Sequence, residues 1–209
     1  MVSPANLFAP VQSAQPPPTT VQHWIDVSNY QGYLDDAWFA HWSALGFGGL
    51  IVQAVTGTDG RTYTRSQLQA GLNHGWTNAG YIWVNYKQAN HMKVFDAKLH
   101  LFDGFQLDFL ANDVEEMQMD LADVSAALQS CDSYLGRPRD VWIYTRENLF
   151  TKAYGWANLQ PWPDRKLWVA NYDGIPDVNV GFQPFCGWTQ AEMKQWTDLP
   201  LDQNVRRMP

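Results

Sequence analysis

Several apolar, strand-like segments of this chain carry a carboxylic acid near one end. A buried charge is costly unless it is paired, hydrogen-bonded or used in chemistry. Acids gathered at one site can divide the work of glycoside hydrolysis: one carboxylic acid protonates the leaving oxygen, and other carboxylates steer water or stabilise an oxocarbenium-like centre. Crowding also raises the pKa of one acid, which keeps it protonated for that task. The acids in question are Asp26, Asp108, Asp113, Glu115, Asp173 and Asp202.

Strand-like and helix-like segments alternate from residue 22 onward and decide where these acids lie. Strands that alternate with helices favour a parallel sheet, and eight possible strands in one domain favour a closed barrel. We therefore predict a single irregular, TIM-like α/β barrel, spanning residues 22–209, with few helices in its C-terminal third. The predicted strands are 23–28, 47–58, 79–86, 105–115, 140–145, 166–173, 193–198 and 201–205, and the predicted helices are 34–45, 64–76 and 118–136.

A barrel of this kind would bring the acids together. The C-terminal ends of the strands build the active site of a β/α barrel, and several of these acids lie near the ends of predicted strands. We expect these acids to converge in one acidic cleft at that mouth: Asp26, Asp108 or Asp113 with Glu115, Asp173 and Asp202.

The composition favours a sugar-binding cleft over other kinds of site. The chain has 11 Trp, 9 Tyr and 10 Phe, and tryptophan at this density suits a cleft that stacks on flat ligands. The net charge is −7, without the basic footprint of a nucleic-acid binder or of a protein that binds anionic membranes. We therefore expect neither nucleic acid nor membrane insertion, and no run of 18 apolar residues is present.

Metal and cofactor motifs are missing from the sequence. The two cysteines, Cys131 and Cys186, form no CxxC pair, and the five histidines show no ligand spacing. No phosphate-binding glycine loop is present either. We expect no metal and no cofactor.

The first 21 residues differ in character from the rest. They are rich in Pro, Ser and Gln, and they lack the basic start and apolar run of a secretory signal. The PPP run favours extended polyproline II structure. We interpret residues 1–21 as a flexible arm that could dock on a protein or virion partner, with plain disorder as the alternative.

Six segments, taken in order, resemble glycoside hydrolase family 25, the Chalaropsis-type lysozymes. They are IDVSNYQG, AGYIWVNY, NDVEE, VWIYT, LWVANYD and KQWTD followed by LDQN. The resemblance implies a hydrolase, extracellular or phage-borne, that cleaves the β-1,4 bond between N-acetylmuramic acid and N-acetylglucosamine in peptidoglycan at the bacterial cell wall. It implies Glu115 as general acid, Asp113 beside it, and Asp26 and Asp202 as the rest of an acidic floor. The sugar cleft would be lined by Tyr81, Trp83, Tyr144 and Trp168.

The fourth-strand motif departs from the family pattern. The family has a compact Leu-Asp-x-Glu, whereas LDFLANDVEEM offers two registers. Asp108 follows a leucine but puts Leu110 where the glutamate belongs, and Asp113 keeps Glu115 but follows Asn112. We favour the register with Asp113. The split motif leaves one alternative open: an inactive glycan-binding or structural protein on the same barrel, such as a phage virion component.

Each acid also has a structural explanation. Asp26 could be a hydrogen-bonded buried carboxylate, Glu115 part of the acidic first turn of the next helix, and Asp202 a turn residue. Only their joint order favours the catalytic interpretation.

Overall fold

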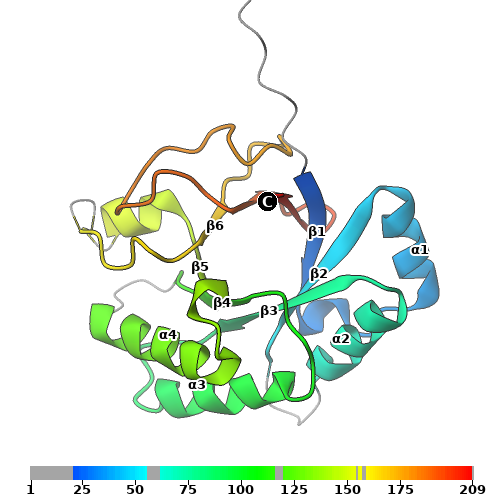
Figure 1. Cartoon of the computed structure of the whole chain (residues 1–209), viewed down its shortest axis with the longest axis horizontal. Coiled ribbons are helices and arrows are strands. Elements are labelled where there is room, and N and C mark those ends of the chain that lie inside the picture. Colours follow the sequence, from blue (N-terminus) through cyan, green and yellow to red (C-terminus); the bar gives the residue numbers. More distant parts are fainter. Residues whose placement is uncertain (1–20, 56–61, 116–119, 154, 157–158, 209) are drawn as a thin grey trace, which may run out of the picture.

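The computed structural model describes residues 21–55, 62–115, 120–153, 155–156 and 159–208. Its centre is a closed barrel of eight strands in sequence order, which confirms the predicted fold (Figure 1). The predicted arm lies outside the described residues except for Val21, which begins the first strand. The strands are β1 (Val21–Val27), β2 (Phe47–Gln53), β3 (Thr77–Trp83), β4 (Leu110–Asp113), β5 (Val141–Thr145), β6 (Leu167–Ala170), β7 (Met193–Thr197) and β8 (Asp202–Arg207).

Strands β1 to β7 run parallel, and β8 is antiparallel to both of its neighbours, β7 and β1. The cause is the short connection 198–201, since a parallel crossover needs a dozen or more residues. Asp202 therefore stands at the start of its strand. The sequence-based prediction, which placed it near the C-terminal end of a strand, is wrong on this point. Because β8 is reversed, its start still lies at the mouth formed by the C-terminal ends of the other strands.

Alternation along the strands separates two apolar cores. Trp24 faces the barrel interior, whereas Ile25 and Val27 face the surrounding helices. The interior is filled by large rings set beside small residues, including the stacked pair Phe109 and Trp142, whose centroids are 3.8 Å apart. The remaining interior residues are Ile51, Ala79, Ala111, Tyr144, Trp168, Ala170 and Met193.

Gly49 on β2 makes room for the Trp24 ring. A Cβ at position 49 would lie 2.1 Å from a ring atom of Trp24, so no other residue fits without moving that ring. The large side chain of β1 and the missing one of β2 are thus complementary parts of one packing layer.

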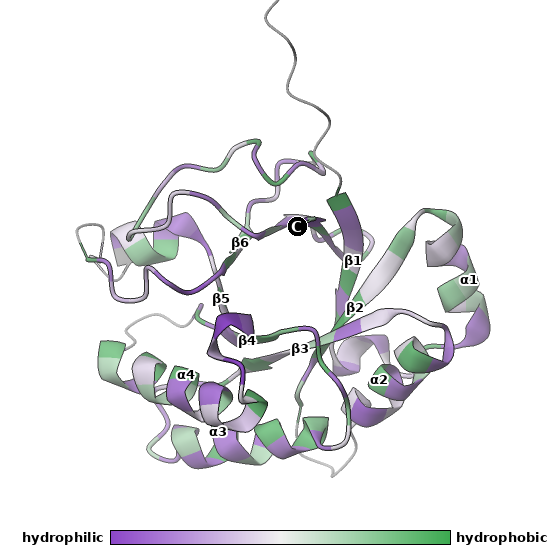
Figure 2. Cartoon of the chain, viewed as in Figure 1, coloured by the Kyte–Doolittle hydropathy of each residue, from purple (hydrophilic) through white to green (hydrophobic). Residues whose placement is uncertain are grey.

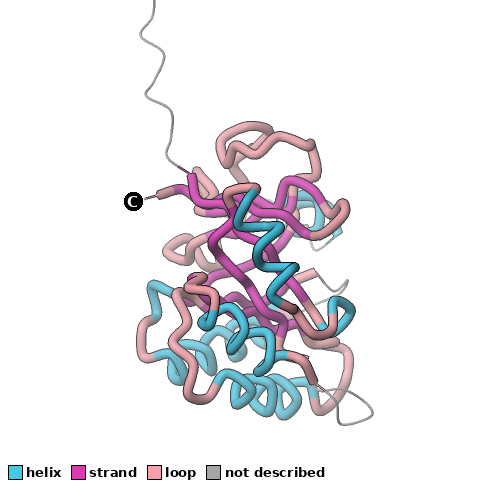
Figure 3. The backbone as a smooth tube through the Cα atoms, turned by 90° about the vertical axis from the view of Figure 1, so that its right-hand side faces the viewer, coloured by secondary structure: helices cyan, strands magenta, loops and turns pink. Residues whose placement is uncertain are grey.

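Four helices cover the barrel wall on one side (Figures 1 and 3). In Figure 2 they are striped with hydrophobic and hydrophilic residues, as expected for helices that bury one face. Helices α1, α2 and α4 match predicted ones, whereas α3 was not predicted. The helices are α1 (Asp36–Ala44), α2 (Thr64–Asn73), α3 (His91–Leu99) and α4 (Leu121–Leu135).

The buried face of α3 explains why the sequence did not reveal it. Lys98 lies on that face beside Phe95 and Leu99 and donates a hydrogen bond to the Trp83 carbonyl. A lysine in the buried stripe breaks the apolar pattern. The N-cap residue Asn90 makes no side-chain cap bond, so the start signal is weak as well.

The connection between β6 and β7 contains no α-helix. Loop replaces the helix that would usually pack outside these strands, as predicted for the C-terminal third (Figure 3). Among the described helices, none is both long and apolar enough to cross a membrane.

Asp108 lies at the opposite end of the barrel from the mouth. It precedes β4 and forms an ion pair with Arg206, near the end of the antiparallel strand β8. The Arg206 guanidinium lies 5.0 Å from the Trp142 ring centroid and 5.6 Å from that of Trp24. In a regular strand, Asp108 and Asp113 would face opposite ways, and the sequence therefore predicts Asp108 between barrel and helices, where an unpaired charge is costly. The ion pair with Arg206 shows that this prediction is wrong.

Candidate active site

A pocket of about 280 Å³ opens at the mouth of the barrel. All eight residues predicted for the site line it, together with four that were not predicted. The acids are Asp26, Asp113, Glu115 and Asp202, the predicted aromatic residues are Tyr81, Trp83, Tyr144 and Trp168, and the additional residues are Gln53, Arg146, Tyr172 and Gln195.

Asp26 is held by two amide side chains. Its Oδ2 accepts hydrogen bonds from Asn204 Nδ2 at 2.7 Å and from Gln195 Nε2 at 3.1 Å. The residue is 4% exposed and comes from β1, while its partners come from β8 and β7. Alternation points Trp24 and Asp26 to the same interior face, so the acid continues the packed core upward into the pocket.

Aromatic side chains orient both amides. The hydroxyls of Tyr144 and Tyr172 donate to Gln195 Oε1, and the indole Nε1 of Trp168 donates to Asn204 Oδ1 at 2.7 Å. With each amide oxygen occupied in this way, its NH₂ group is left to face Asp26. The side chains of this network come from β5, β6, β7, β8 and the loop after β6, and together they fix the position of the Asp26 carboxylate.

The structure resolves the register of the fourth strand. Phe109 and Ala111 face the interior, and Asp113, the last residue of β4, follows in the same direction into the pocket. Asn112 points outward, where its Oδ1 accepts a hydrogen bond from the Tyr86 hydroxyl at 2.9 Å. The unusual asparagine therefore lies outside the pocket, with its Oδ1 bonded and its buried Nδ2 without a partner among the described residues. Asp113 is brought to the mouth, and Asp108 is not.

Asp113 is the most constrained acid of the pocket. It is 6% exposed, and its Oδ1 has no hydrogen-bond partner among the described residues. Burial raises its pKa well above the usual range, and the charges of Glu115 and Asp26 raise it further. A buried carboxylate oxygen without a partner is unfavourable in the folded protein, and Asp113 lies where an incoming ligand could supply one.

Glu115 lies two residues further on and is more accessible than Asp113. Its Oε1 accepts a hydrogen bond from Arg146 Nε at 2.8 Å, and its side chain is 22% exposed. Arg146 directly follows β5. Because Oε1 faces the guanidinium, Oε2 is the oxygen left outside this hydrogen bond.

Asp26 on β1 and Asp202 on β8 also have raised pKa values. Burial raises the pKa of Asp26 well above its usual range, and the charge of Asp202 raises it further. The pKa of Asp202 is raised to about 6, by burial first and then by the charges of Asp198 and Glu115. A positively charged centre entering the pocket would favour the ionised forms of these acids.

The aromatic residues play two different structural roles. Tyr81 and Trp83 are half-buried and present surface to the pocket, whereas Tyr144 and Trp168 are 5% and 1% exposed. The two buried rings mainly hold Gln195 and Asn204, as described above. Of these four, Tyr81 and Trp83 offer ring surface to a sugar, and Tyr172, which is 42% exposed, adds a third ring at the pocket.

Sequence reasoning gave no role to the two amides. Gln195 and Asn204 lie in the closing motifs KQWTD and LDQN, and their spacing carries a usable signal. Each is two residues from a side chain that faces the interior, namely Met193 and Asp202, so alternation places them on the pocket side. Arg146 directly follows β5 and lay outside every motif, whereas Tyr172 lies two residues after β6, inside LWVANYD, but was given no role.

Asp173, the remaining acid near a predicted strand end, does not join the pocket and instead pairs with Lys194. Among the described residues, no group of three or more His, Cys, Asp or Glu side chains is arranged to hold a metal ion. Both cysteines are buried and free.

A barrel mouth that gathers four carboxyls beside aromatic surface is a site of the glycoside hydrolase type. The comparison with protein families agrees. The family described as Glycosyl hydrolases family 25 matches residues 25–204, and the chain belongs to it. The predicted family and the predicted enzyme class, a glycoside hydrolase, are confirmed.

Individual relatives are more distant. A probable GH family 25 lysozyme 5 from Dictyostelium discoideum is 41% identical over 59 residues, which are 28% of this chain and 26% of that protein. The solved structure of a family 25 glycosyl hydrolase from Bacillus anthracis has a TM-score of 0.65 at 14% identity, covering 90% of this chain and 89% of that one. The spore cortex lytic enzyme SleM from Clostridium perfringens has a TM-score of 0.66 at 16% identity, covering 89% and 67%. At these identities the two structures show a shared fold.

Proposed function

We propose that this protein is a peptidoglycan hydrolase that cleaves the β-1,4 bond between N-acetylmuramic acid and N-acetylglucosamine. The observation that carries the proposal is the convergence of four acids from β1, β4 and β8 on one pocket, in a chain of glycosyl hydrolase family 25. The relatives named a lysozyme and a spore cortex lytic enzyme support this choice of substrate. The place of action would be the bacterial cell wall, where this polymer occurs.

Glu115 is the general acid in this proposal. Its side chain is 22% exposed and keeps one carboxyl oxygen outside its hydrogen bond to Arg146, so it can protonate the glycosidic oxygen as the bond breaks. Asp113 and Asp26 stabilise the positive charge that develops on the sugar ring, and Asp202 adds to that field. Tyr81 and Trp83 supply ring surface for the sugar, while Tyr144 and Trp168 position the amides around Asp26.

The test is the identity of the new chain ends. Purified cell walls are incubated with the protein, the released reducing ends are reduced with borohydride, and the resulting sugar alcohols are separated. The proposal predicts loss of turbidity and the alcohol of muramic acid as the product. Release of the glucosamine alcohol would assign a different bond. Binding to the walls without any new reducing ends would contradict the hydrolase assignment.

A further inference from the structure

A second pocket, of about 300 Å³, adjoins the catalytic one. The two share Arg146 and Tyr172, which form the ridge between them. The side pocket is bounded by the start of the π-helical segment after β5, by the end of β6 and by the loop that follows β6. Its surface mixes apolar side chains with amides: Val169, Phe182, Phe185, Asn148, Asn171 and Gln183.

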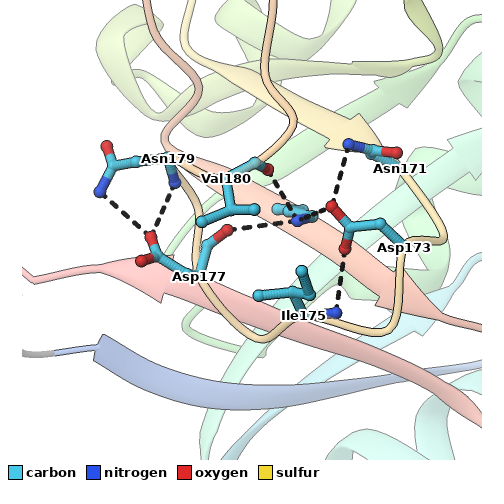
Figure 4. Close-up of polar contacts among 7 residues, drawn as sticks. Asn171, Asp173, Ile175, Asp177, Asn179 and Val180 are labelled. Atoms are coloured by element: carbon cyan, nitrogen blue, oxygen red, sulfur yellow. Dashed lines mark hydrogen bonds and ion pairs between the residues drawn. The ribbon is translucent and has the colours of Figure 1, made fainter.

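The wall of the side pocket is built around a buried cation. Lys194 points outward from β7, is fully buried, and its ammonium group bonds the loop after β6. Figure 4 labels its partners on that loop, Asp173, Asp177 and Val180. Its Nζ donates to Asp173 Oδ2 at 2.7 Å, to the Val180 carbonyl at 2.8 Å and to the Asp177 carbonyl at 3.3 Å. The three protons of the ammonium group thus have three acceptors. A loop that stands in for a helix is thereby fixed in one conformation.

Gly181 shows how closely this wall is fitted. Its φ is +74°, and a Cβ there would lie 2.4 Å from Asn171 Nδ2 and 2.7 Å from Asp173 Oδ2. Asn171 lines the pocket, and Asp173 is the partner of Lys194. The glycine lets the loop close against both residues, so the pocket is shaped before any ligand arrives.

Arg146 has donors to spare at the entrance to this pocket. Its Nε is used by Glu115, and its guanidinium lies 5.3 Å from the centre of the Tyr172 ring. The four N–H groups on Nη1 and Nη2 have no hydrogen-bond partner among the described residues. An edge of this kind, with two parallel donors, matches a carboxylate. The net charge of the chain is −7, so the Arg146 guanidinium also offsets the repulsion between the protein and an anionic polymer at the ridge between the two pockets.

We propose that the side pocket is a subsite for the peptide that the lactyl group of muramic acid carries, with Arg146 binding a carboxylate of that peptide. The inference rests on the proposed function, because it requires a muramic acid residue in the catalytic pocket. A peptide matches the mixed lining, since its methyl groups can contact the half-buried Phe182 and its amides can bond Asn171 and Gln183.

The test compares two substrates that differ only in charge. Soluble, uncrosslinked peptidoglycan is used as prepared, and again after its carboxyl groups have been converted to neutral amides. For the wild type, we expect amidation to raise KM about tenfold with little change in kcat, the low end for a hydrogen bond to a charged group at a partly exposed site. Arg146→Gln should have the raised KM on both substrates. Arg139→Gln, an exposed arginine outside both pockets, should behave as the wild type.

Two results would overturn the inference. If amidation leaves the wild-type KM unchanged, no carboxylate is recognised. If Arg146→Gln lowers kcat by one common factor on both substrates while KM keeps its dependence on amidation, Arg146 acts only by positioning Glu115. Should the wild type release no reducing ends from either substrate, the proposed function fails. The inference is then tested by the affinities of the wild type for the native and amidated polymers. Equal affinities would reject it. A tenfold difference that Arg146→Gln removes would support it.

Discussion

Asp26 and Asp202 lie directly opposite each other on the antiparallel strands β1 and β8. Side chains in such a pair have Cβ atoms about 4.5–5.5 Å apart, and like charges there are destabilising. The arrangement exists because β8 runs backward. A parallel eighth strand would have carried Asp202 away from the mouth. The reversed strand therefore makes the acidic site and also concentrates negative charge in it.

Asp202→Asn should stabilise the protein at neutral pH. The pKa of Asp202 is about 6 in the folded protein, against 3.8 for the free side chain, so the folded state binds the proton more tightly and wild-type stability falls as pH rises between these values. The variant lacks this loss. Because the side chain is only half-buried, we expect about 1 kcal/mol, or about 2–4 °C in Tm, at pH 7, and no gain near pH 3. Thermal melts at both pH values test this. A difference that is the same at both pH values would contradict it.

Asp113→Asn should lower activity, whereas Asp108→Asn should lower stability and keep activity. Asp113→Asn removes a charge beside the reacting sugar, so activity should fall by about 10²-fold or more. Asp108→Asn breaks the ion pair with Arg206 at the far end of the barrel, so activity per folded molecule should be retained while the protein loses stability, by about 1–3 kcal/mol. Turnover and urea unfolding of both variants provide the comparison. The reverse order of activities would favour the other register.

Asn204→Ala should lower the stability of the protein and raise the pKa of Asp26. The change removes the 2.7 Å hydrogen bond to Asp26 and leaves the buried Trp168 Nε1 without its acceptor, at about 1–3 kcal/mol. The hydrogen bond from Asn204 lowers the pKa of Asp26, so its loss should move the acidic limb of the pH–activity profile to higher pH. Unfolding curves and pH–rate profiles test the two parts separately. An unchanged acidic limb would show that Asp26 does not control it.

Removal of residues 1–20 should change Tm by no more than a few degrees. These residues are rich in Pro, Ser and Gln, so we expect them to contribute little apolar area to a core. Melting curves of the full chain and of a chain that begins at Val21 would test this. A large drop in Tm would mean that the arm packs on the barrel or on another subunit.

Much of the fold could be predicted because the strand pattern was strong. Dense apolar runs such as the one through Leu50 and Val52 bury both faces, and the spacing of strands and helices specified a barrel. The direction of β8 could not be read from periodicity, which is the same for both directions. It followed instead from the length of the connection 198–201. Helix α3 escaped prediction because Lys98 interrupts its buried face.

The acids and aromatic residues were found by their order along the chain, whereas the residues that hold them were not. Gln195 and Asn204 matter because three rings direct their amides toward Asp26, and such a network depends on contacts between distant strands. Arg146 depends in the same way on its contact with Glu115. Residue type and spacing indicate which groups can do chemistry. The residues that hold these groups come from distant strands, so they can be identified only from the three-dimensional structure.

The most direct test of the account is the release of reducing ends from purified cell walls by the wild type and by Glu115→Gln. Glutamine keeps the shape of the side chain and an acceptor for Arg146 but cannot donate the proton. The ion pair that it replaces is partly exposed, so stability should change little. The account predicts activity in the wild type and a loss of about 10²–10⁴-fold in the variant, with matching melting curves. Equal activity of the two proteins would contradict the assignment of Glu115 as the general acid.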